Sequence, residues 1–155
     1  MSHTTCCCSA SLGRCDRCDL LIDLEGFHLI AVARRESGLV LDIESCDRLA
    51  GCPGCGVIAQ GHGRVVVEVV DAPWAGVPAR IRWHKRRWMC RERTCQIVTF
   101  TEQNRSVCAP RELLGVRAIR WAIRQLRFEG ATIAGLARQL GTTWNTVWSH
   151  IKPFL

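Results

Sequence analysis

Two pairs of cysteines in the middle of the chain have the spacing of ligands for one metal ion. Cys52 and Cys55 lie in the sequence Cys-Pro-Gly-Cys-Gly, and Cys90 and Cys95, separated by four residues, follow further along. Each turn brings two thiolates to one point, and four thiolates complete the tetrahedron that Zn²⁺ prefers in structural sites. Because four thiolates leave no position for a reactive water, the spacing predicts one structural zinc site and no catalytic one.

Other side chains offer alternatives to this ligand set. His62 and His84 could each replace a cysteine, but a histidine in a polar loop or on a basic strand is more often simply exposed. Cys46 and Cys108 are expected to be small buried apolar residues or free thiols. Four thiolates also hold a single iron in rubredoxin-like electron carriers, so iron is the alternative metal.

Five further cysteines fall near the N-terminus. Cys15 and Cys18 have ligand spacing, and three more precede them: Cys6, Cys7 and Cys8. No strands separate these cysteines, and the segment has little apolar content around which to fold. A flexible, reduced tail over residues 1–19 is therefore favoured over a second zinc site within Cys6–Cys18.

The C-terminal third has the pattern of two short helices joined by a tight turn. Thr132 and Thr143 are good N-cap residues, and Gly141 lies where the first helix must end. Apolar residues recur at helical spacing on both sides of that glycine: Ile133, Leu136, Ala137 and Leu140, then Trp144, Val147, Trp148 and Ile151. With a supporting helix expected over residues 111–128, the pattern predicts a helix-turn-helix; an ordinary helical hairpin is the alternative.

The second short helix, Thr143–Lys152, would lie in the major groove of DNA. Asparagine can bond two atoms of an adenine edge, serine and threonine can bond several base edges, and lysine pairs with phosphate. The polar side chains on or beside this helix that are expected to contact DNA are Thr142, Thr143, Asn145, Thr146, Ser149 and Lys152.

Positive charge is concentrated in two segments. The chain has a formal net charge of +7 and a pI near 9.0. Residues 80–93 hold seven basic residues and one acidic residue, and residues 110–155 hold seven and two. Such clustering favours contacts with phosphate over a merely solvated face. The arginines expected to make these contacts are Arg82, Arg86, Arg117, Arg120, Arg124 and Arg127.

The fold expected from these patterns is α+β. Alternating and β-branched sequences predict strands, with a loop over 71–78; the strands cover residues 27–34, 39–44, 64–70 and 79–89. In the last strand Ile81 and Trp83 alternate with basic residues, which indicates one buried face. A small β-rich, zinc-ribbon-like module over residues 20–108 should precede a three-helix module over 109–155.

Composition excludes several classes of protein. The 155 residues include no apolar run near the ~20 needed to span a bilayer, and the N-terminus has neither the basic start nor the apolar stretch of a secretory signal. Eleven cysteines without an export signal should be reduced thiols, which suggests metal before disulfides. We therefore expect a cytoplasmic protein with no membrane partner, associated with the nucleoid when bound to DNA.

With both modules considered, the chain resembles bacterial insertion-sequence transposases of the ISL-three family over about residues 20–155. The similar stretches are Cys-Pro-Gly-Cys-Gly at 52–56, Asp-Ala-Pro-Trp at 71–74, Lys-Arg-Arg-Trp-Met-Cys at 85–90, Phe-Thr-Glu at 100–102 and the segment 135–153. The resemblance implies that the four cysteines of 52–95 bind zinc. It also implies that the helical segment reads double-stranded DNA at transposon terminal inverted repeats during DNA transposition.

In one respect the sequence departs from that family. The family's nuclease-like domain uses three carboxylates and two metal ions, whereas only Glu112 and Glu129 are acidic after residue 110. We therefore expect that this chain binds DNA but is not an enzyme by itself. It would bind alone, self-associate or associate with a full-length transposase. Two alternatives share its chemistry: a stand-alone DNA-binding regulator and an inhibitor of transposition. A structural zinc scaffold for protein contacts is a third.

Overall fold

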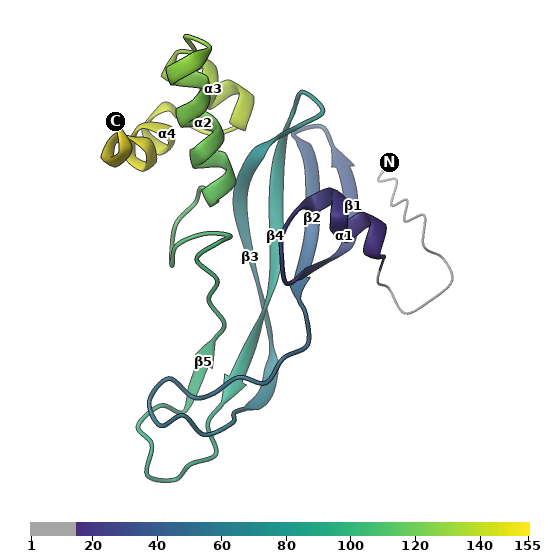
Figure 1. Cartoon of the computed structure of the whole chain (residues 1–155), viewed down its shortest axis with the longest axis vertical. Helices are drawn as coiled ribbons and strands as arrows, with labels where there is room; N and C mark the ends of the chain where they lie inside the picture. The colour runs from purple at the N-terminus through teal and green to yellow at the C-terminus, as the bar shows by residue number, and fades with distance from the viewer. Residues whose placement is uncertain (1–14) are drawn as a thin grey trace.

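The computed structural model describes residues 15–155, so the predictions for Cys6, Cys7 and Cys8 lie outside the described residues. The chain combines a long twisted sheet with a group of helices at one end, as Figure 1 shows. This agrees with the expected α+β class. No helix of the described residues is long and apolar enough to cross a membrane.

The sheet has the strand order β1-β2-β4-β3, and β5 also pairs with β4. The pairs β1/β2, β3/β4 and β4/β5 are antiparallel, whereas β2 and β4 run parallel. Since β3 and β4 are the longest strands, their hairpin runs the length of the molecule and connects its two ends (Figure 1). The bounds are β1 Phe27–Arg35, β2 Gly38–Ser45, β3 Gln60–Trp74, β4 Val77–Met89 and β5 Thr99–Thr101.

The expected loop over 71–78 was wrong. Strand β3 continues to Trp74 and β4 begins at Val77, so the turn is only Ala75-Gly76, both with positive φ. Two residues with positive φ match the type I′ turn that suits the right-handed twist of a hairpin. Pro73 falls in the register shift between Asp71 and Trp74 of this edge strand, and bulges and edge strands are the places in a sheet where proline is tolerated.

The basic strand β4 has the predicted buried face. Ala79, Ile81 and Trp83 are buried, and the residues between them are half-buried. Trp83 lies edge-on to Phe27 of β1, with ring centroids 5.4 Å apart. Ile81, Trp83 and Phe27 belong to a first core cluster, completed by Ile22, Leu24, Ile43, Val69, Val107 and Cys108.

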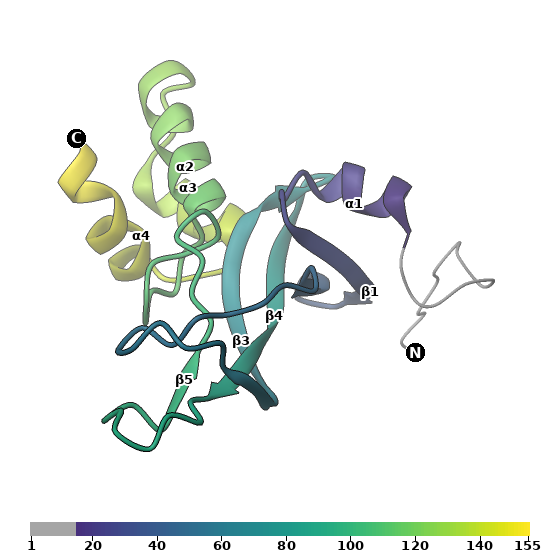
Figure 2. The ribbon, with the colours of Figure 1, turned by 60° about the horizontal axis from the view of Figure 1, so that its bottom comes forward.

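Three helices pack together and against the β3–β4 hairpin, on the β3 side of the sheet (Figure 2). They are α2 Val116–Phe128, α3 Ile133–Leu140 and α4 Trp144–Ile151, followed by the short 3-10 helix η1 Lys152–Phe154. The buried residues of the three helices form a second core cluster with Val70 of β3 and Leu114, which precedes α2. The helix residues of this cluster are Ala118, Ala122, Leu136, Ala137, Leu140, Val147 and Ile151.

The first of these helices begins later than expected, at Val116 and not near residue 111. The backbone before it pairs with the edge strand: Leu113 O accepts from Val70 N, and Gly115 N donates to Val70 O, each at 2.8 Å. Residues 113–115 thus satisfy the backbone N–H and C=O of Val70 on β3, and the side chain of Leu114 is fully buried. Tertiary pairing here prevails over the helical pattern.

The segment before β1 also differs from the expectation. Residues 16–19, which were expected to belong to a tail, form the first part of helix α1, Asp16–Ile22. Ile22 is buried in the first core cluster, whereas Leu20 and Leu21 are exposed. The helix contacts β1, the edge strand at the opposite side of the sheet from β3.

Two arginines join the sheet to the helices. Arg117 of α2 forms an ion pair with Asp71 of β3 and donates to Ile22 O; the Asp71 side chain is 1% exposed. Arg80 of β4 donates to the carbonyls of Leu140 (3.0 Å) and Gly141 (2.5 Å), at the end of α3. The proposed division near residue 108 therefore separates two parts that share one continuous interface.

Candidate metal centre and helical face

The first cysteine pair lies in a tight turn between β2 and β3. Cys52 N donates to Val57 O and Gly56 N donates to Cys52 O, both at 2.8 Å, and the Gly54 amide approaches the Cys52 sulfur at 3.4 Å. Gly54 faces the second pair so closely that a Cβ there would lie 3.3 Å from Cys95 Sγ and 3.0 Å from Ile97. Glycine therefore lets the two turns meet.

The second pair follows β4 directly. Cys90 N donates to Val98 O at 2.9 Å, which extends the pairing toward β5, and Cys95 N donates to Glu92 O at 3.2 Å. The long hairpin thus returns the chain to the first turn. Both turns lie in the lower part of Figure 1, around β5.

The four sulfurs form one compact cluster. Cys52 Sγ and Cys95 Sγ are 3.7 Å apart, Cys55 Sγ and Cys90 Sγ are 3.6 Å apart, and all four lie within 4.8 Å of one another. Zinc–thiolate bonds of about 2.3 Å in a tetrahedron place the sulfurs about 3.8 Å apart. The donor set and its dimensions therefore fit one zinc ion.

The thiols differ in how readily they lose a proton. Burial raises the pKa of Cys52, but hydrogen bonds from the amides of Gly54 and Cys55 and from the other thiols outweigh it and lower the pKa to about 7. The amide of Glu92 lowers the pKa of Cys90, but burial and the neighbouring thiols raise it to about 12. One thiolate thus opposes ionisation of the next, and a cation among them removes that opposition.

The alternative ligands lie elsewhere. His84 Nε2 is 2.7 Å from Asp42 Oδ1 on the sheet, and His62 is exposed on β3. Cys108 is buried in the first core cluster, as expected, and burial raises the pKa of its thiol. Cys46 is half-buried, with His28 as its neighbour.

On the helical face, the local signals predicted from the sequence are present. The side chain of Thr132 accepts from Gly135 N and that of Thr143 from Thr146 N, so both threonines are N-caps. Gly141 ends α3 with φ +61°, and a Cβ there would lie 3.0 Å from Pro78. Asn145, Ser149 and Lys152 are exposed, together with Thr143, whereas Thr142 and Thr146 are half-buried.

The six arginines expected to contact phosphate fall into two groups. Arg120, Arg124 and Arg127 are exposed along α2, and Arg127 also donates to Phe154 O at 3.0 Å. The other three pair with acidic residues of the protein itself: Arg82 with Asp42 at 3.4 Å, Arg86 with Asp47 at 2.6 Å, and Arg117 with Asp71. Their charges are already partly neutralised.

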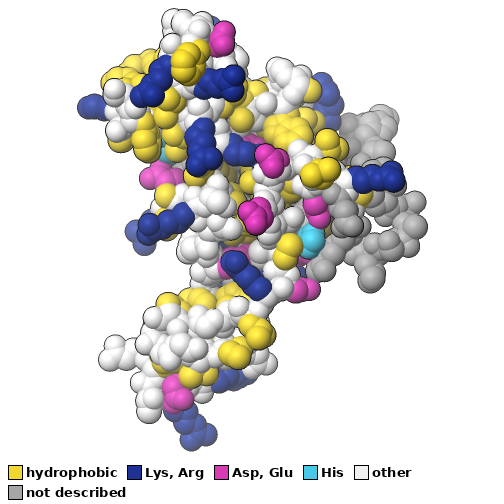
Figure 3. Space-filling model, viewed as in Figure 1, with side chains coloured by type: hydrophobic (Ala, Val, Ile, Leu, Met, Phe, Trp, Pro, Cys, Tyr) yellow, Lys and Arg dark blue, Asp and Glu magenta, His cyan; other side chains and the backbone are white. Residues whose placement is uncertain are grey.

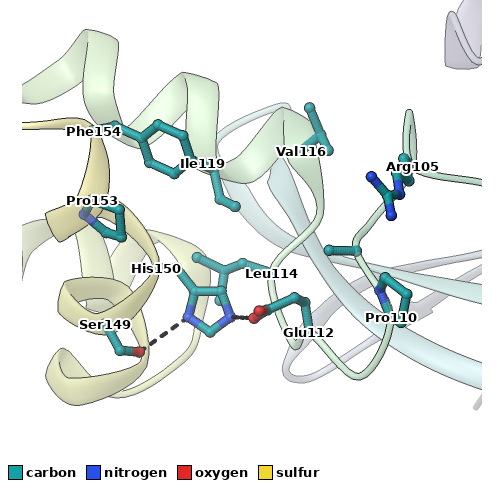
Figure 4. Close-up of a pocket in the computed structure, with 11 residues that line it drawn as sticks. Arg105, Pro110, Glu112, Leu114, Val116, Ile119, Ser149, His150, Pro153 and Phe154 are labelled. Atoms are coloured by element: carbon teal, nitrogen blue, oxygen red, sulfur yellow. Dashed lines mark hydrogen bonds and ion pairs between the residues drawn. The ribbon is translucent and has the colours of Figure 1, made fainter.

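A pocket of about 530 Å³ lies between α4 and the segment that precedes α2 (Figure 4). His150 projects into it from α4, with Nε2 2.5 Å from Glu112 and Nδ1 2.7 Å from Thr146 O. Both neighbours are hydrogen-bond acceptors, so the ring is held between α4 and residue 112. The pocket wall is mainly apolar and includes Leu114, Ile119 and Phe154.

Sequence reasoning missed several polar residues that hold these parts in place. Glu102 is buried and accepts from Ser45 Oγ (2.7 Å), Trp83 Nε1 (3.1 Å) and Arg86 N (2.8 Å). Lys85 is 5% exposed and lies 4.2 Å from the Trp83 ring centroid. No spacing signal marks these residues, because their partners come from distant parts of the chain.

Residues 48–95, which include both cysteine pairs and the β3–β4 hairpin, match a family model described as the zinc-finger of transposase IS204/IS1001/IS1096/IS1165. This segment therefore has a transposase-type zinc-ribbon domain with a four-cysteine cluster. No curated protein and no solved structure matches the chain.

Proposed function

We propose that this chain is the zinc-dependent, sequence-specific DNA-binding part of a transposase, and that it recognises the terminal inverted repeats of a transposon. The observation that carries the proposal is the combination in one molecule of a transposase-type zinc ribbon with a capped α3–turn–α4 unit. In this proposal zinc bound by the four cysteines stabilises the ribbon and takes no part in chemistry.

Support for a DNA-reading role of α4 comes from the division of its surface. Val147 and Ile151 are fully buried against the other helices, whereas Asn145 and Ser149 on the remaining face are exposed. A helix held in this way by its apolar face presents its polar side chains to a partner. The N-terminus of α4, capped by Thr143, would face the duplex.

Support for phosphate contacts comes from α2. Arg120, Arg124 and Arg127 follow one another at helical spacing and are exposed, and no acidic side chain is an ion-pair partner of theirs among the described residues. We propose that this stripe contacts the DNA backbone and that Arg82, Arg86 and Arg117, already paired internally, contribute less.

The test is selection of binding sites from random duplexes by the zinc-loaded chain, compared with the variant Asn145→Ala. Loss of a bidentate contact costs roughly 1–3 kcal/mol of discrimination. We therefore expect the variant to lose preference at one A·T pair and to keep its non-specific affinity. Ser149→Ala is the matched control on the same face, and it should change a different position. Identical base preferences in all three proteins, or none in the wild type, would contradict the proposal.

The salt dependence of binding tests the α2 stripe separately. Each phosphate contact adds about 0.9 to the slope of log affinity against log salt. Arg120→Ala with Arg124→Ala should flatten the slope on every duplex, whereas Arg86→Ala should change it much less. The genomic location of the selected sequence then separates the two roles: paired sites at element ends support transposition, and sites at unrelated promoters support a regulator.

A further inference from the structure

Three side chains at the β1 edge of the sheet form a chain of hydrogen bonds that the proposed DNA-binding role does not use. Cys46 Sγ lies 3.1 Å from His28 Nε2, and His28 Nδ1 lies 2.5 Å from Asp19 Oδ2. Cys46 is not in the four-cysteine cluster, so zinc at that cluster does not occupy its sulfur. A thiol, an imidazole and a carboxylate in this order are the components of an activated nucleophile.

The fold fixes the orientation of the imidazole. Asp19 lies on α1, and its second oxygen accepts from Leu29 N at 2.7 Å, next to the irregularity in the pairing of β1 with β2. The carboxylate is thus held at both oxygens and can rotate little. Because a carboxylate only accepts hydrogen bonds, His28 Nδ1 must carry the proton, which leaves Nε2 to accept from the thiol.

Cys46 is placed by the end of β2. Its amide donates to Gly26 O at 2.9 Å, which continues the β1/β2 ladder by one step beyond Ser45. Since side chains alternate along a strand, Cys46 lies on the same face as Glu44, the cross-strand partner of His28. Glu44 is paired with Arg64 at 2.9 Å and Asp47 with Arg86 at 2.6 Å, so both nearby carboxylates have cationic partners.

We propose that Cys46 is a reactive thiol site, with His28 as its base and Asp19 as the residue that positions the base, and that its substrate is a small peroxide. The thiol is half-buried, so a reagent as small as hydrogen peroxide fits better than a bulky one. This site is independent of the zinc cluster and of the proposed DNA-binding face.

The reaction balances with hydrogen peroxide as the oxidant. His28 Nε2 takes the proton from Cys46, and the thiolate attacks one peroxide oxygen. A sulfur–oxygen bond forms as the oxygen–oxygen bond breaks, and the imidazolium returns its proton to the departing hydroxide. The products are the sulfenic acid of Cys46 and water; sulfur is oxidised and peroxide is reduced.

The test treats the zinc-loaded full chain with limiting hydrogen peroxide, traps sulfenic acid with dimedone and measures the product at Cys46 by mass spectrometry. The reference is a peptide of residues 44–48, which has the same local sequence without His28. An ordinary thiol is a few per cent thiolate at pH 7. Because His28 Nε2 is placed to take its proton, we expect Cys46 to react about tenfold faster than the peptide at pH 7.

Two variants separate the roles. His28→Asn should reduce the rate at Cys46 to that of the peptide. Asp19→Asn should have a smaller effect, because the base remains but is less well oriented. The proposal is overturned if wild-type Cys46 reacts no faster than the peptide; this result is read on the wild-type chain and does not require a folded variant.

Discussion

The two ends of the β3–β4 hairpin are stabilised in different ways. At the turn end, the hairpin packs against three helices, with a second core cluster, the buried pair Asp71–Arg117 and the two bonds from Arg80 to the end of α3. At the cysteine end, Val57, Ile58 and Val98 are all exposed, and the buried side chains there are mainly the cysteines themselves. Figure 3 shows the molecule narrowing between the two ends.

This difference indicates what each end requires in order to fold. At the helical end, the apolar surface buried in the core stabilises the fold, and this stabilisation does not depend on a metal ion. The cysteine end buries little apolar surface to offset the entropy of its ordered turns, so we expect a metal ion at the four cysteines to supply the difference. On this expectation the same hairpin depends on packing at one end and on coordination at the other.

The largest expected effect is on the cysteine end. Metal binding contributes on the order of 10–16 kcal/mol to the folding of zinc-finger peptides. Cys90→Ser should therefore abolish stoichiometric zinc and expose the amides of residues 52–57 and 90–98 to hydrogen exchange, while the amides of α2–α4 stay protected. Cys46→Ser is the control and should keep one zinc per chain. Loss of protection in the helices at the same rate as in the cysteine turns would contradict this comparison.

The stability of the helical end should be most sensitive to loss of the ion pair between Arg117 and the buried Asp71. Arg117→Ala leaves the Asp71 carboxylate buried without its partner, which costs about 3–5 kcal/mol of stability. Arg120→Ala, three residues further along the same helix and exposed, should change the free energy of unfolding by less than about 0.5 kcal/mol. Urea unfolding at saturating zinc measures both. Equal effects of the two substitutions would show that Asp71 does not need Arg117.

A smaller effect is expected within α4. Thr143→Ala removes the N-cap bond to Thr146 N, a loss of about 1 kcal/mol. Thr142→Ala, one residue earlier, removes no cap and should be nearly neutral. Both variants should bind one zinc, since the caps lie at the other end of the hairpin. A change in zinc affinity in either variant would mean that the two ends are more strongly coupled than the packing suggests.

The parts of the fold predicted correctly are those that local sequence determines. The caps Thr132 and Thr143, the stop at Gly141 and the alternation of buried Ile81 and Trp83 with basic residues each depend on neighbours within a few residues, and the structure contains all of them. The four-cysteine cluster was also predictable, because each pair is local and one hairpin is enough to bring the pairs together.

The parts that were missed depend on distant partners. Arg117 belongs by its spacing to the stripe on α2, but Asp71, 46 residues earlier, pairs with it. Helix α2 starts late because residues 113–115 pair with Val70. Glu102 gave no signal, since its donors come from two other strands. The DNA contacts assigned to α4 stay predictions.

Strand β4 also sets a distance. Arg80 of β4 donates to the turn between α3 and α4, and Cys90, ten residues later, directly follows Met89, the last residue of that strand. At about 3.3 Å per residue the separation is about 33 Å. This is close to the 34–36 Å of one turn of B-form DNA. If the chain binds DNA as we propose, a duplex lying parallel to this strand would turn the same groove toward the helical end and toward the cysteine end, one helical repeat apart.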